Sequence, residues 1–279
     1  MKESLIQVKN LSFSYEDGHQ ALNHLNLNIN KGEKLAIMGA NGSGKSTFFL
    51  CLNGIHKPQE GQLLFHNSPI DYSRKGLLKL REKIGIVFQD PNHQLFASNV
   101  YQEIAFGPLN LGVSATDAKI AVDQIMEELE ITPFKDRPTH FLSGGQKKIV
   151  SIADVLVMNP DVVIFDEPTA ALDPKHVSIV NQLIEQIHQK GITVVISTHD
   201  VDYAYEFADR VALFHKGQIL STGTPEKIFS DQQLLKKTNL HMPSVLSFYQ
   251  TLCEHGILDS DLPLPKTMDD VGEYLKRTP

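Results

Sequence analysis

The sequence predicts an α/β fold in which a core of buried parallel strands follows an antiparallel sheet near the N-terminus. Three short apolar runs without alternation, at 34–38, 161–165 and 192–198, are typical of parallel strands buried on both faces. The first 30 residues instead alternate apolar and polar side chains, as a half-buried antiparallel sheet does. Because 41% of the 279 residues are hydrophobic, the chain can bury a sizeable core.

The N-terminal elements follow from this alternation and from glycine positions. A first strand containing Ile6 and Val8 should pair with a second strand at 25–29, and Gly18 lies in the turn between them. The apolar strand at 34–38 then leads through a glycine-rich loop into a helix that ends at Gly54. Strand, glycine loop and helix together open an α/β unit.

The later elements complete the predicted sheet. A helix with apolar residues at positions 180, 183, 184 and 187 should connect the strands at 161–165 and 192–198, and Gly191 follows as its stop. The runs at 211–214 and 217–221 predict a closing hairpin. Between the core strands, 89–155 predicts a helical insertion, with an apolar stripe that includes Ala118 and Leu129. From 231 to 279 the pattern becomes helical and proline-rich, which predicts a small C-terminal appendage.

Composition excludes several classes of protein. The net charge of −7 disfavours a nucleic-acid partner, because nucleic-acid-binding domains are usually basic. No run approaches the ~18 apolar residues that a membrane span needs. The first ten residues lack the apolar run of a signal peptide, so we expect a cytosolic chain. Cys51 and Cys253 are expected to be packed thiols.

A phosphate-binding motif follows the strand at 34–38. Gly39, Gly44, Lys45 and Ser46 fit the pattern G-x-x-x-x-G-K-[ST], placed between a strand and a helix as its mechanism requires. Backbone N–H groups of such a loop surround phosphate oxygens, and the helix N-terminus adds partial positive charge. Lys45 would neutralise the β- and γ-phosphates, and the Ser46 hydroxyl could bind Mg²⁺.

Two further motifs indicate chemistry on that phosphate. Asp166 and Glu167 end an apolar strand, where carboxylates are costly unless they meet a cation or hydrogen-bond donors. Asp166 is therefore interpreted as a Mg²⁺ partner, and Glu167 as the group that polarises an attacking water. The run LSGGQ at 142–146 predicts an anion-binding helix end on the helical insertion, although alone it could be a simple helix cap.

Three single residues complete the pattern. Gln89 follows the apolar strand IGIVF and opens a polar loop, while His199 follows the strand at 192–198 and should lie beside the phosphate site. Tyr15 ends the first strand run, where an aromatic ring either stacks on a base or joins the core.

In this order, GANGSGKST, Gln89, LSGGQ, VVIFDEP, ALDP and His199 resemble the ATP-binding cassette of ABC transporters over about 1–230. The resemblance implies a P-loop NTPase core with an N-terminal antiparallel β-sheet, a helical signature subdomain and a small C-terminal helical appendage. It implies ATP and Mg²⁺ as cofactors, an ATPase activity, and a metal site made by Ser46, Gln89 and Asp166. Glu167 would be the catalytic base, His199 would sense the γ-phosphate, and Gln89 would be the third catalytic residue.

The resemblance also implies a composite nucleotide site. One chain would contribute Tyr15, Gly39, Asn41, Gly42, Ser43, Gly44, Lys45, Ser46 and Thr47. The opposing subunit would contribute Ser143, Gly144, Gly145 and Gln146, with Asp173 of ALDP at the dimer seam. Because both halves are intact in this chain, a homodimer is favoured, and pairing with a homologous second ATPase is the alternative.

A narrower resemblance concerns the segment from PIDYSRKG to IAFGPLNLG, which is similar to the ATPase subunits of energy-coupling-factor importers. With KTNLHMP and the tail, the chain most resembles the cobalt-importer subunit, and vitamin or nickel importers are the alternatives. This implies integral membrane partners and a peripheral place at the cytoplasmic face of the membrane. The segment 89–112, with exposed Leu95 and Phe96, is expected to be the docking loop.

Two positions depart from the family pattern, and two other classes of function compete. Ile149 stands where an Arg is usual, and Asp154 stands where a Gly is usual. A soluble ABC ATPase acting on DNA or ribosomes would carry long coiled coils or a second cassette, and neither is found here. A non-hydrolysing regulator is disfavoured because Glu167 and His199 are both intact.

Overall fold

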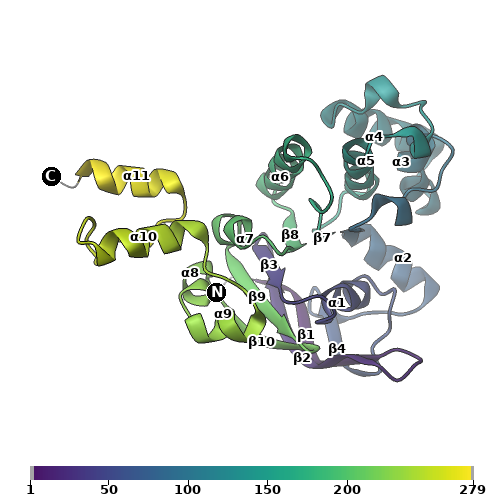
Figure 1. The fold of residues 1–279 in the computed structure, drawn as a ribbon. Helices are drawn as coiled ribbons and strands as arrows, with labels where there is room; N and C mark the ends of the chain where they lie inside the picture. Colours follow the sequence, from purple (N-terminus) through teal and green to yellow (C-terminus); the bar gives the residue numbers. More distant parts are fainter. Residues whose placement is uncertain (1–2, 278–279) are drawn as a thin grey trace.

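The computed structural model describes residues 3–277 (Figure 1). Its first half contains β1 (Ser4–Ser14), β2 (Gln20–Asn30), β3 (Lys34–Met38), α1 (Lys45–Leu52), β4 (Glu60–Phe65), β5 (Ser68–Pro69), α2 (Arg74–Lys83), β6 (Ile84–Val87), η1 (Pro91–His93), α3 (Val100–Asn110), α4 (Ala115–Glu128), η2 (Thr132–Phe134) and η3 (Thr139–Phe141). Its second half contains α5 (Gly144–Leu156), β7 (Val162–Asp166), α6 (Pro174–Gln189), β8 (Thr193–Ser197), α7 (Val201–Phe207), β9 (Arg210–His215), β10 (Gln218–Gly223), α8 (Pro225–Phe229), α9 (Gln232–Thr238), α10 (Ser244–Glu254) and α11 (Met268–Arg277).

Two sheets organise these elements. The smaller sheet is antiparallel and has the order β2-β1-β4-β5, and the larger has the order β10-β9-β3-β8-β7-β6. Within the larger sheet β9, β3, β8, β7 and β6 run parallel, and β10 pairs antiparallel with β9 at the edge. The predicted α/β class, the antiparallel N-terminal sheet and the closing hairpin are therefore confirmed.

Helix α1 lies between the two sheets, and most of its side chains are buried. Its side chains Phe48, Phe49, Cys51 and Leu52 are at most 1% exposed, and they share one core with the inner faces of both sheets. Burial raises the pKa of the Cys51 thiol to about 12, so this cysteine behaves as a packed apolar group. The core thus fixes the N-terminus of α1, where the phosphate motif begins.

The opposite face of the larger sheet is covered by helices that include the C-terminal ones. Helices α6 and α7 pack on this face, and Phe229 of α8, Leu235 of α9 and Leu246 of α10 join the same core with at most 4% exposure. Figure 1 shows α10 and α11 projecting away from the sheets beyond α7. The C-terminal region is thus anchored in the main core through α8, α9 and α10, and α10 and α11 extend outward from it.

The chain between β6 and β7 forms a separate helical layer, as the sequence predicts. Helices α3, α4 and α5 enclose their own core, which contains Val100, Ile104, Val122 and Met126 (Figure 1). The expectation of a loop over 89–112 is wrong in part, because most of the second half of this segment is α3. Helix α3 begins at an Asn99 cap and buries one side against α5.

The expected exposure of the segment is also corrected in part. Phe96 is 65% exposed, but Leu95 is half-buried, because it packs against the core of the helical layer. Within residues 3–277, no helix combines the length and the apolar character that crossing a membrane requires.

The anchoring of the C-terminal helices can be tested with two matched phenylalanines. Phe229→Ala should lower the free energy of unfolding by about 3–5 kcal/mol, because it removes a fully buried ring and leaves a cavity. Phe248→Ala, at a ring that is 41% exposed on α10, should cost clearly less. Urea unfolding followed by circular dichroism measures both. Equal costs would mean that α8 does not pack into the main core.

Candidate functional site

The carboxyl ends of three parallel strands place the predicted motifs at one edge of the larger sheet. In the strand register, Ile37 of β3 and Asp166 of β7 both lie beside Ser197 of β8. The phosphate loop follows β3, Glu167 follows β7, and His199 follows β8 by two residues. This edge is where open α/β sheets generally bind ligands.

The phosphate loop adopts a backbone that requires glycine next to α1. Gly44 has φ +105°, and a Cβ built on it would lie 2.5 Å from the carbonyl oxygen of Ala21. Lys45 is 6% exposed, and its Nζ donates to the carbonyl oxygens of Gly39 at 2.8 Å and Ala40 at 3.3 Å. Burial lowers the pKa of Lys45, whereas the nearby Glu167 and Asp166 carboxylates raise it. A bound phosphate would supply further negative charge to this buried ammonium.

The loop and its neighbours enclose a cavity of about 400 Å³. Ten of the predicted residues line it: Tyr15, Asn41, Gly42, Ser43, Gly44, Lys45, Ser46, Thr47, Gln89 and Glu167. His19 and Ala21 also line it, and sequence reasoning missed both. Gly39 contacts the cavity indirectly, through its carbonyl bond to Lys45.

Glu167 is held by three side chains from the ends of β6 and β8, the two strands that flank β7. Gln89 Nε2 donates to Glu167 Oε2 at 3.1 Å, and His199 Nε2 lies 2.8 Å from Glu167 Oε1. The Glu167 N–H donates to Ser197 Oγ at 2.9 Å, and its φ of +44° is unusual for a residue with a side chain. Such strained backbone is concentrated at functional sites. The carboxylate is therefore oriented toward the phosphate cavity and can accept a proton there.

Asp166 lies one residue deeper and is a buried carboxylate that could hold a cation. It is 8% exposed and accepts a hydrogen bond of 2.6 Å from Ser197 Oγ to its Oδ1. Gln89 uses its amide nitrogen for Glu167, so its amide oxygen takes no part in that bond. The Ser46 hydroxyl, the Asp166 carboxylate and the Gln89 amide oxygen form an all-oxygen set, which fits the preference of Mg²⁺.

Tyr15 lies at the outer rim of the cavity. Its hydroxyl is 2.8 Å from Thr47 Oγ1, its ring is 38% exposed, and Phe13 and His56 pack edge-on against it. The His19 ring lies nearly parallel to the Tyr15 ring with centroids 6.4 Å apart. These two rings form an aromatic rim on which a planar base could stack.

The signature residues lie outside this cavity, on the helical layer. Ser143 caps α5: its Oγ accepts from the Gln146 N–H at 3.2 Å, and its N–H donates to Gln146 Oε1 at 3.1 Å. This reciprocal pair leaves the exposed Gly144 N–H among the open donors of the helix end. The LSGGQ segment thus forms a helix cap, and the same helix end keeps open N–H donors that an anion could use.

Asp173 is linked to the signature through His176. Asp173 caps α6, and its Oδ2 shares a hydrogen bond with His176 Nδ1, which lowers the pKa of Asp173. A Cβ built on Gly145 would lie only 1.9 Å from His176 Cδ2, so the imidazole rests directly on that glycine. Within one chain, the signature end and Asp173 thus form a second cluster, separate from the phosphate cavity.

Sequence reasoning did not predict two residues near the carboxylates of Asp166 and Glu167. One is Ser197, which bonds both residues, and the other is the buried Lys148. Ser197 bonds Asp166 and Glu167 together, and its alignment opposite Asp166 could have been expected from the two parallel strands. Lys148 is fully buried within α5 and bonds the carbonyl oxygens of Phe88 and Gln89. No spacing signal in the sequence distinguishes Lys148 from its neighbour Lys147.

Comparisons with known proteins agree with this geometry. The ABC transporter family model matches residues 22–170. The chain is 46% identical to the energy-coupling factor transporter ATP-binding protein EcfA3 of Clostridium perfringens over 266 residues, covering 95% of this chain and 93% of that protein. It is 43% identical to EcfA of Methanococcus maripaludis over 275 residues, covering 98% and 99% of the two chains.

Solved structures of ABC transporter ATPases also resemble this chain. CbiO1 from Clostridium perfringens, described as part of the ABC transporter complex CbiONQ, superposes with a TM-score of 0.75 at 45% identity, covering 91% of this chain and all of that one. The cassette MJ0796, solved as a post-hydrolysis dimer bound to ADP and Pi, superposes with a TM-score of 0.71 at 31% identity, covering 79% of this chain and 98% of that one.

The chain therefore belongs to the ABC transporter ATP-binding family, and it is an ATPase with a P-loop NTPase fold. Within the family, it belongs to the energy-coupling factor transporter ATP-binding proteins.

The contribution of the phosphate loop can be measured by removing its charge. Lys45→Ala should weaken ATP binding by about 10- to 100-fold, because a charge-assisted hydrogen bond to phosphate contributes about 1.5–3 kcal/mol. Calorimetric titration with ATP and Mg²⁺ measures the affinity. Lys9→Ala, at an exposed lysine of β1, serves as the control and should bind normally. Unchanged affinity in Lys45→Ala would exclude this loop as the nucleotide site.

Proposed function

We propose that this chain powers an energy-coupling-factor importer at the cytoplasmic face of a membrane, with cobalt ions as the transported substrate. The observation that carries the ATPase part is the Glu167 carboxylate, held by Gln89 and His199 at the mouth of the phosphate cavity. Its relatives are named as ATP-binding proteins of energy-coupling factor transporters. Cobalt rests on the resemblance of the segment 69–112 and of KTNLHMP to cobalt-importer subunits.

We assign the steps of hydrolysis to named groups. Lys45 and the loop N–H groups bind the phosphates, and Tyr15 supports the adenine at the rim of the cavity. Ser46, Asp166 and Gln89 would hold Mg²⁺, which neutralises charge on the β- and γ-phosphates when it is bound. Glu167 accepts a proton from the attacking water, while His199, at 2.8 Å, keeps its carboxylate oriented and senses the γ-phosphate.

The second half of each nucleotide site comes from another subunit. Ser143, Gly144, Gly145 and Gln146 are outside the cavity of their own chain, so a partner must supply them to the ATP bound there. Since this chain carries both halves, two copies can build two equivalent sites with twofold symmetry. A homodimer is therefore favoured, and a heterodimer with a homologous ATPase is the alternative.

A variant that traps ATP tests catalysis and assembly together. Glu167→Gln should bind ATP but hydrolyse it about 10²–10⁴-fold more slowly, because the general base is lost while the shape is kept. Light scattering at tens of micromolar protein should show a dimer with ATP and a monomer with ADP, which lacks the γ-phosphate.

The matched variant places a bulky cation at the proposed seam. Adding Ser143→Arg to Glu167→Gln should block the dimer while leaving ADP affinity intact, since Ser143 is outside the cavity of its own chain. Near-normal turnover in Glu167→Gln would overturn the role of Glu167. A dimer that survives Ser143→Arg would overturn the composite site.

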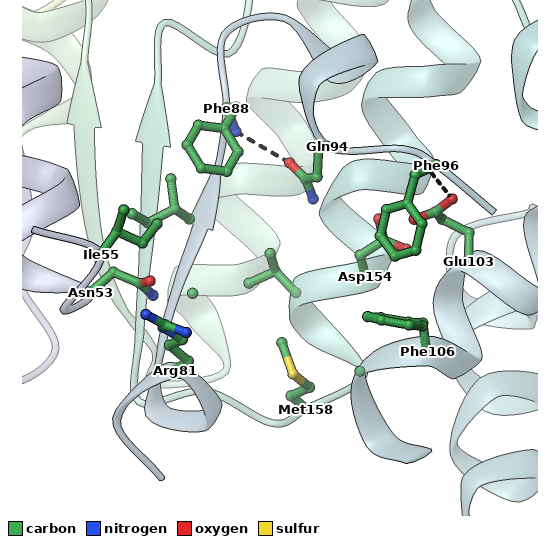
Figure 2. Close-up of a pocket in the computed structure, with 14 residues that line it drawn as sticks. Asn53, Ile55, Arg81, Phe88, Gln94, Phe96, Glu103, Phe106, Asp154 and Met158 are labelled. Carbon is green, nitrogen blue, oxygen red and sulfur yellow. Dashed lines mark hydrogen bonds between the residues drawn. The ribbon is translucent and has the colours of Figure 1, made fainter. Parts of the chain in front are cut away.

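A cavity between the sheet edge and the helical layer is the proposed docking surface for an integral membrane subunit. This docking cavity has a volume of about 220 Å³ and lies between Ile55 and Arg81 on one side and Phe96 and Phe106 on the other (Figure 2). Phe96 is 65% and Phe106 46% exposed, and their rings meet edge-to-face at 4.7 Å. Phenylalanine is among the residues enriched in protein interfaces relative to the rest of the protein surface.

Docking can be separated from nucleotide binding. Phe96→Asp should abolish co-purification with membrane subunits and leave ATP affinity unchanged, because it places a charge on an exposed ring that the partner would bury. Ile120→Asp, on the exposed side of α4 in the same helical layer, is the control and should retain the partners. Retained co-purification in Phe96→Asp would reject this docking surface.

Transport assays identify the substrate. The chain, co-expressed with the membrane subunits of a cobalt importer and reconstituted in vesicles, should drive ATP-dependent uptake of Co²⁺. Ni²⁺ and vitamins are tested in parallel. Uptake of Ni²⁺ or of a vitamin in place of Co²⁺ would keep the transport ATPase and overturn the cobalt assignment. Full ATPase activity with no association to any membrane subunit would favour a soluble ABC ATPase.

We also propose that the chain divides into a nucleotide-binding domain, 1–230, and an appendage, 231–279, with the helical signature subdomain over about 89–155 inside the first. The separate core of α3, α4 and α5 supports the helical subdomain. Exposed apolar residues on the appendage, Phe248 and Met268 among them, support a dimerisation or regulatory role for it.

A further inference from the structure

Helix α2 gathers positive charge in a chain that is acidic overall. Its residues RKGLLKLREK contain five cations and one carboxylate, whereas the whole chain has a net charge of −7. The carboxylate belongs to Glu82, which already pairs with Lys83 at 3.0 Å. Arg74, Lys75 and Lys79 are exposed, and within residues 3–277 none of the three forms an ion pair. Their charges therefore face solvent without a partner in the described chain.

These charges do not serve the stability of the helix. Arg74 and Lys75 lie in its first turn, where the partial positive charge of a helix N-terminus disfavours cations. Lys75 and Lys79 are four residues apart, so two like charges are neighbours on the helix surface. Both arrangements oppose helix formation by small amounts. Their presence on one short helix indicates a partner of opposite charge.

The other side of α2 is fixed in the protein core. Leu80 is 7% exposed and belongs to the core between the two sheets, and Leu77 packs against the same core. Leu78 is instead 40% exposed, on the side of the helix that carries the unpaired cations. We call this side the outer face of α2, made by Arg74, Lys75, Leu78 and Lys79. It is a rigid surface with one exposed apolar side chain among cations.

The outer face of α2 continues the docking cavity. Arg81 and Ile55 form one wall of that cavity (Figure 2). Arg81 follows Arg74 by seven residues, or about two turns, which places both on the same side of α2. Lys57 adds positive charge beside the start of the helix, since its Nζ lies 5.4 Å from the centroid of the Tyr72 ring. An integral membrane subunit seated in the cavity would therefore bring the bilayer toward this basic side.

We propose that the outer face of α2 binds the anionic phospholipid headgroups of the membrane in which the docked subunit lies. This inference rests on the docking cavity proposed above, which directs this side of the chain toward the bilayer. The guanidinium and ammonium groups bind lipid phosphates, and Leu78 contacts the headgroup layer. Each cation near an anionic membrane contributes about fivefold to binding, and salt screens the attraction. The contact holds the ATPase against the bilayer in addition to the partner subunit.

Matched pairs of lysines test this surface in the full chain without any membrane subunit. At low salt, the chain should co-sediment with vesicles that contain phosphatidylglycerol and not with pure phosphatidylcholine vesicles. Lys75→Gln combined with Lys79→Gln should weaken this binding about 20- to 30-fold, because two contributions of about fivefold are lost. Lys236→Gln combined with Lys237→Gln removes the same charge from exposed positions of α9, across the molecule from α2 (Figure 1). This control should change binding by less than about threefold.

Four outcomes would overturn the proposal. The first is no binding of the unaltered chain to the anionic vesicles at low salt, and the second is an equal loss of binding in the two lysine pairs. The third is tighter binding to a DNA duplex than to the vesicles, which would assign the surface to nucleic acid. The fourth is unchanged vesicle binding in Lys75→Gln with Lys79→Gln, with a loss of co-purification in detergent, which would assign the surface to the partner protein.

A single tryptophan locates the contact, because the chain has no tryptophan of its own. Leu78→Trp should show blue-shifted fluorescence with the anionic vesicles and quenching by brominated lipid. Phe248→Trp on α10, where the native side chain is 41% exposed against 40% for Leu78, should show neither response. Equal responses from the two tryptophans would overturn the assignment to α2.

Thermal unfolding separates lipid binding from a structural role of the lysines. Because these charges oppose the helix, Lys75→Gln combined with Lys79→Gln should unfold at no lower temperature than the unaltered chain. A lower unfolding temperature together with lost binding would make the lysines structural and overturn the proposal.

The vesicle assay also separates this inference from the docking cavity, because it contains no membrane subunit. If Phe96→Asp retains the membrane subunits while vesicle binding depends on Lys75 and Lys79, the docking surface fails and the lipid contact holds. If Phe96→Asp loses the subunits while the two lysines have no effect on vesicle binding, the docking surface holds and the lipid contact fails.

Discussion

The parallel register of β3, β8 and β7 is the constraint on which the site depends. It places Ser197 beside Ile37 on one side and Asp166 on the other, so that all three strand ends converge. The Ser197 hydroxyl then serves both carboxylates, donating to Asp166 and accepting from the Glu167 N–H. A shift of β8 by one residue would exchange Ser197 for a neighbour whose side chain points to the opposite face, and both contacts would be lost.

The molecule combines two kinds of internal contact with different consequences. The phosphate loop stands on α1, which is enclosed in the apolar core between the two sheets and has little freedom to move. Helix α5 of the helical layer instead joins the main core through Ile152 and Val155, and it also bonds the end of β6 through Lys148 and Gln94. Apolar enclosure keeps the phosphate loop rigid, whereas the added directional bonds fix α5 relative to the residues that follow β6.

Sequence reasoning predicted the fold class, the strand edges and the closing hairpin, because buried parallel strands and alternating strands leave different patterns. It also predicted that the motif residues lie at one sheet edge, because they follow strands whose carboxyl ends meet at the same edge when the strands are parallel. It did not predict that Leu95 would turn inward, because an apolar side chain in a polar segment can face either core or solvent. Lys148 was missed for the converse reason: a lysine on a helix is usually solvated, and its burial is decided by how two distant segments pack.

The contact between His176 and Gly145 has a consequence for how this sequence can change over generations. The imidazole occupies the volume that a methyl group at position 145 would need, so even alanine is excluded while the histidine stands there. The two positions are 31 residues apart in the chain, yet the constraint between them runs in one direction. Position 145 can gain a side chain only if His176 is displaced or replaced, so related sequences with a side chain at position 145 should lack a histidine at position 176.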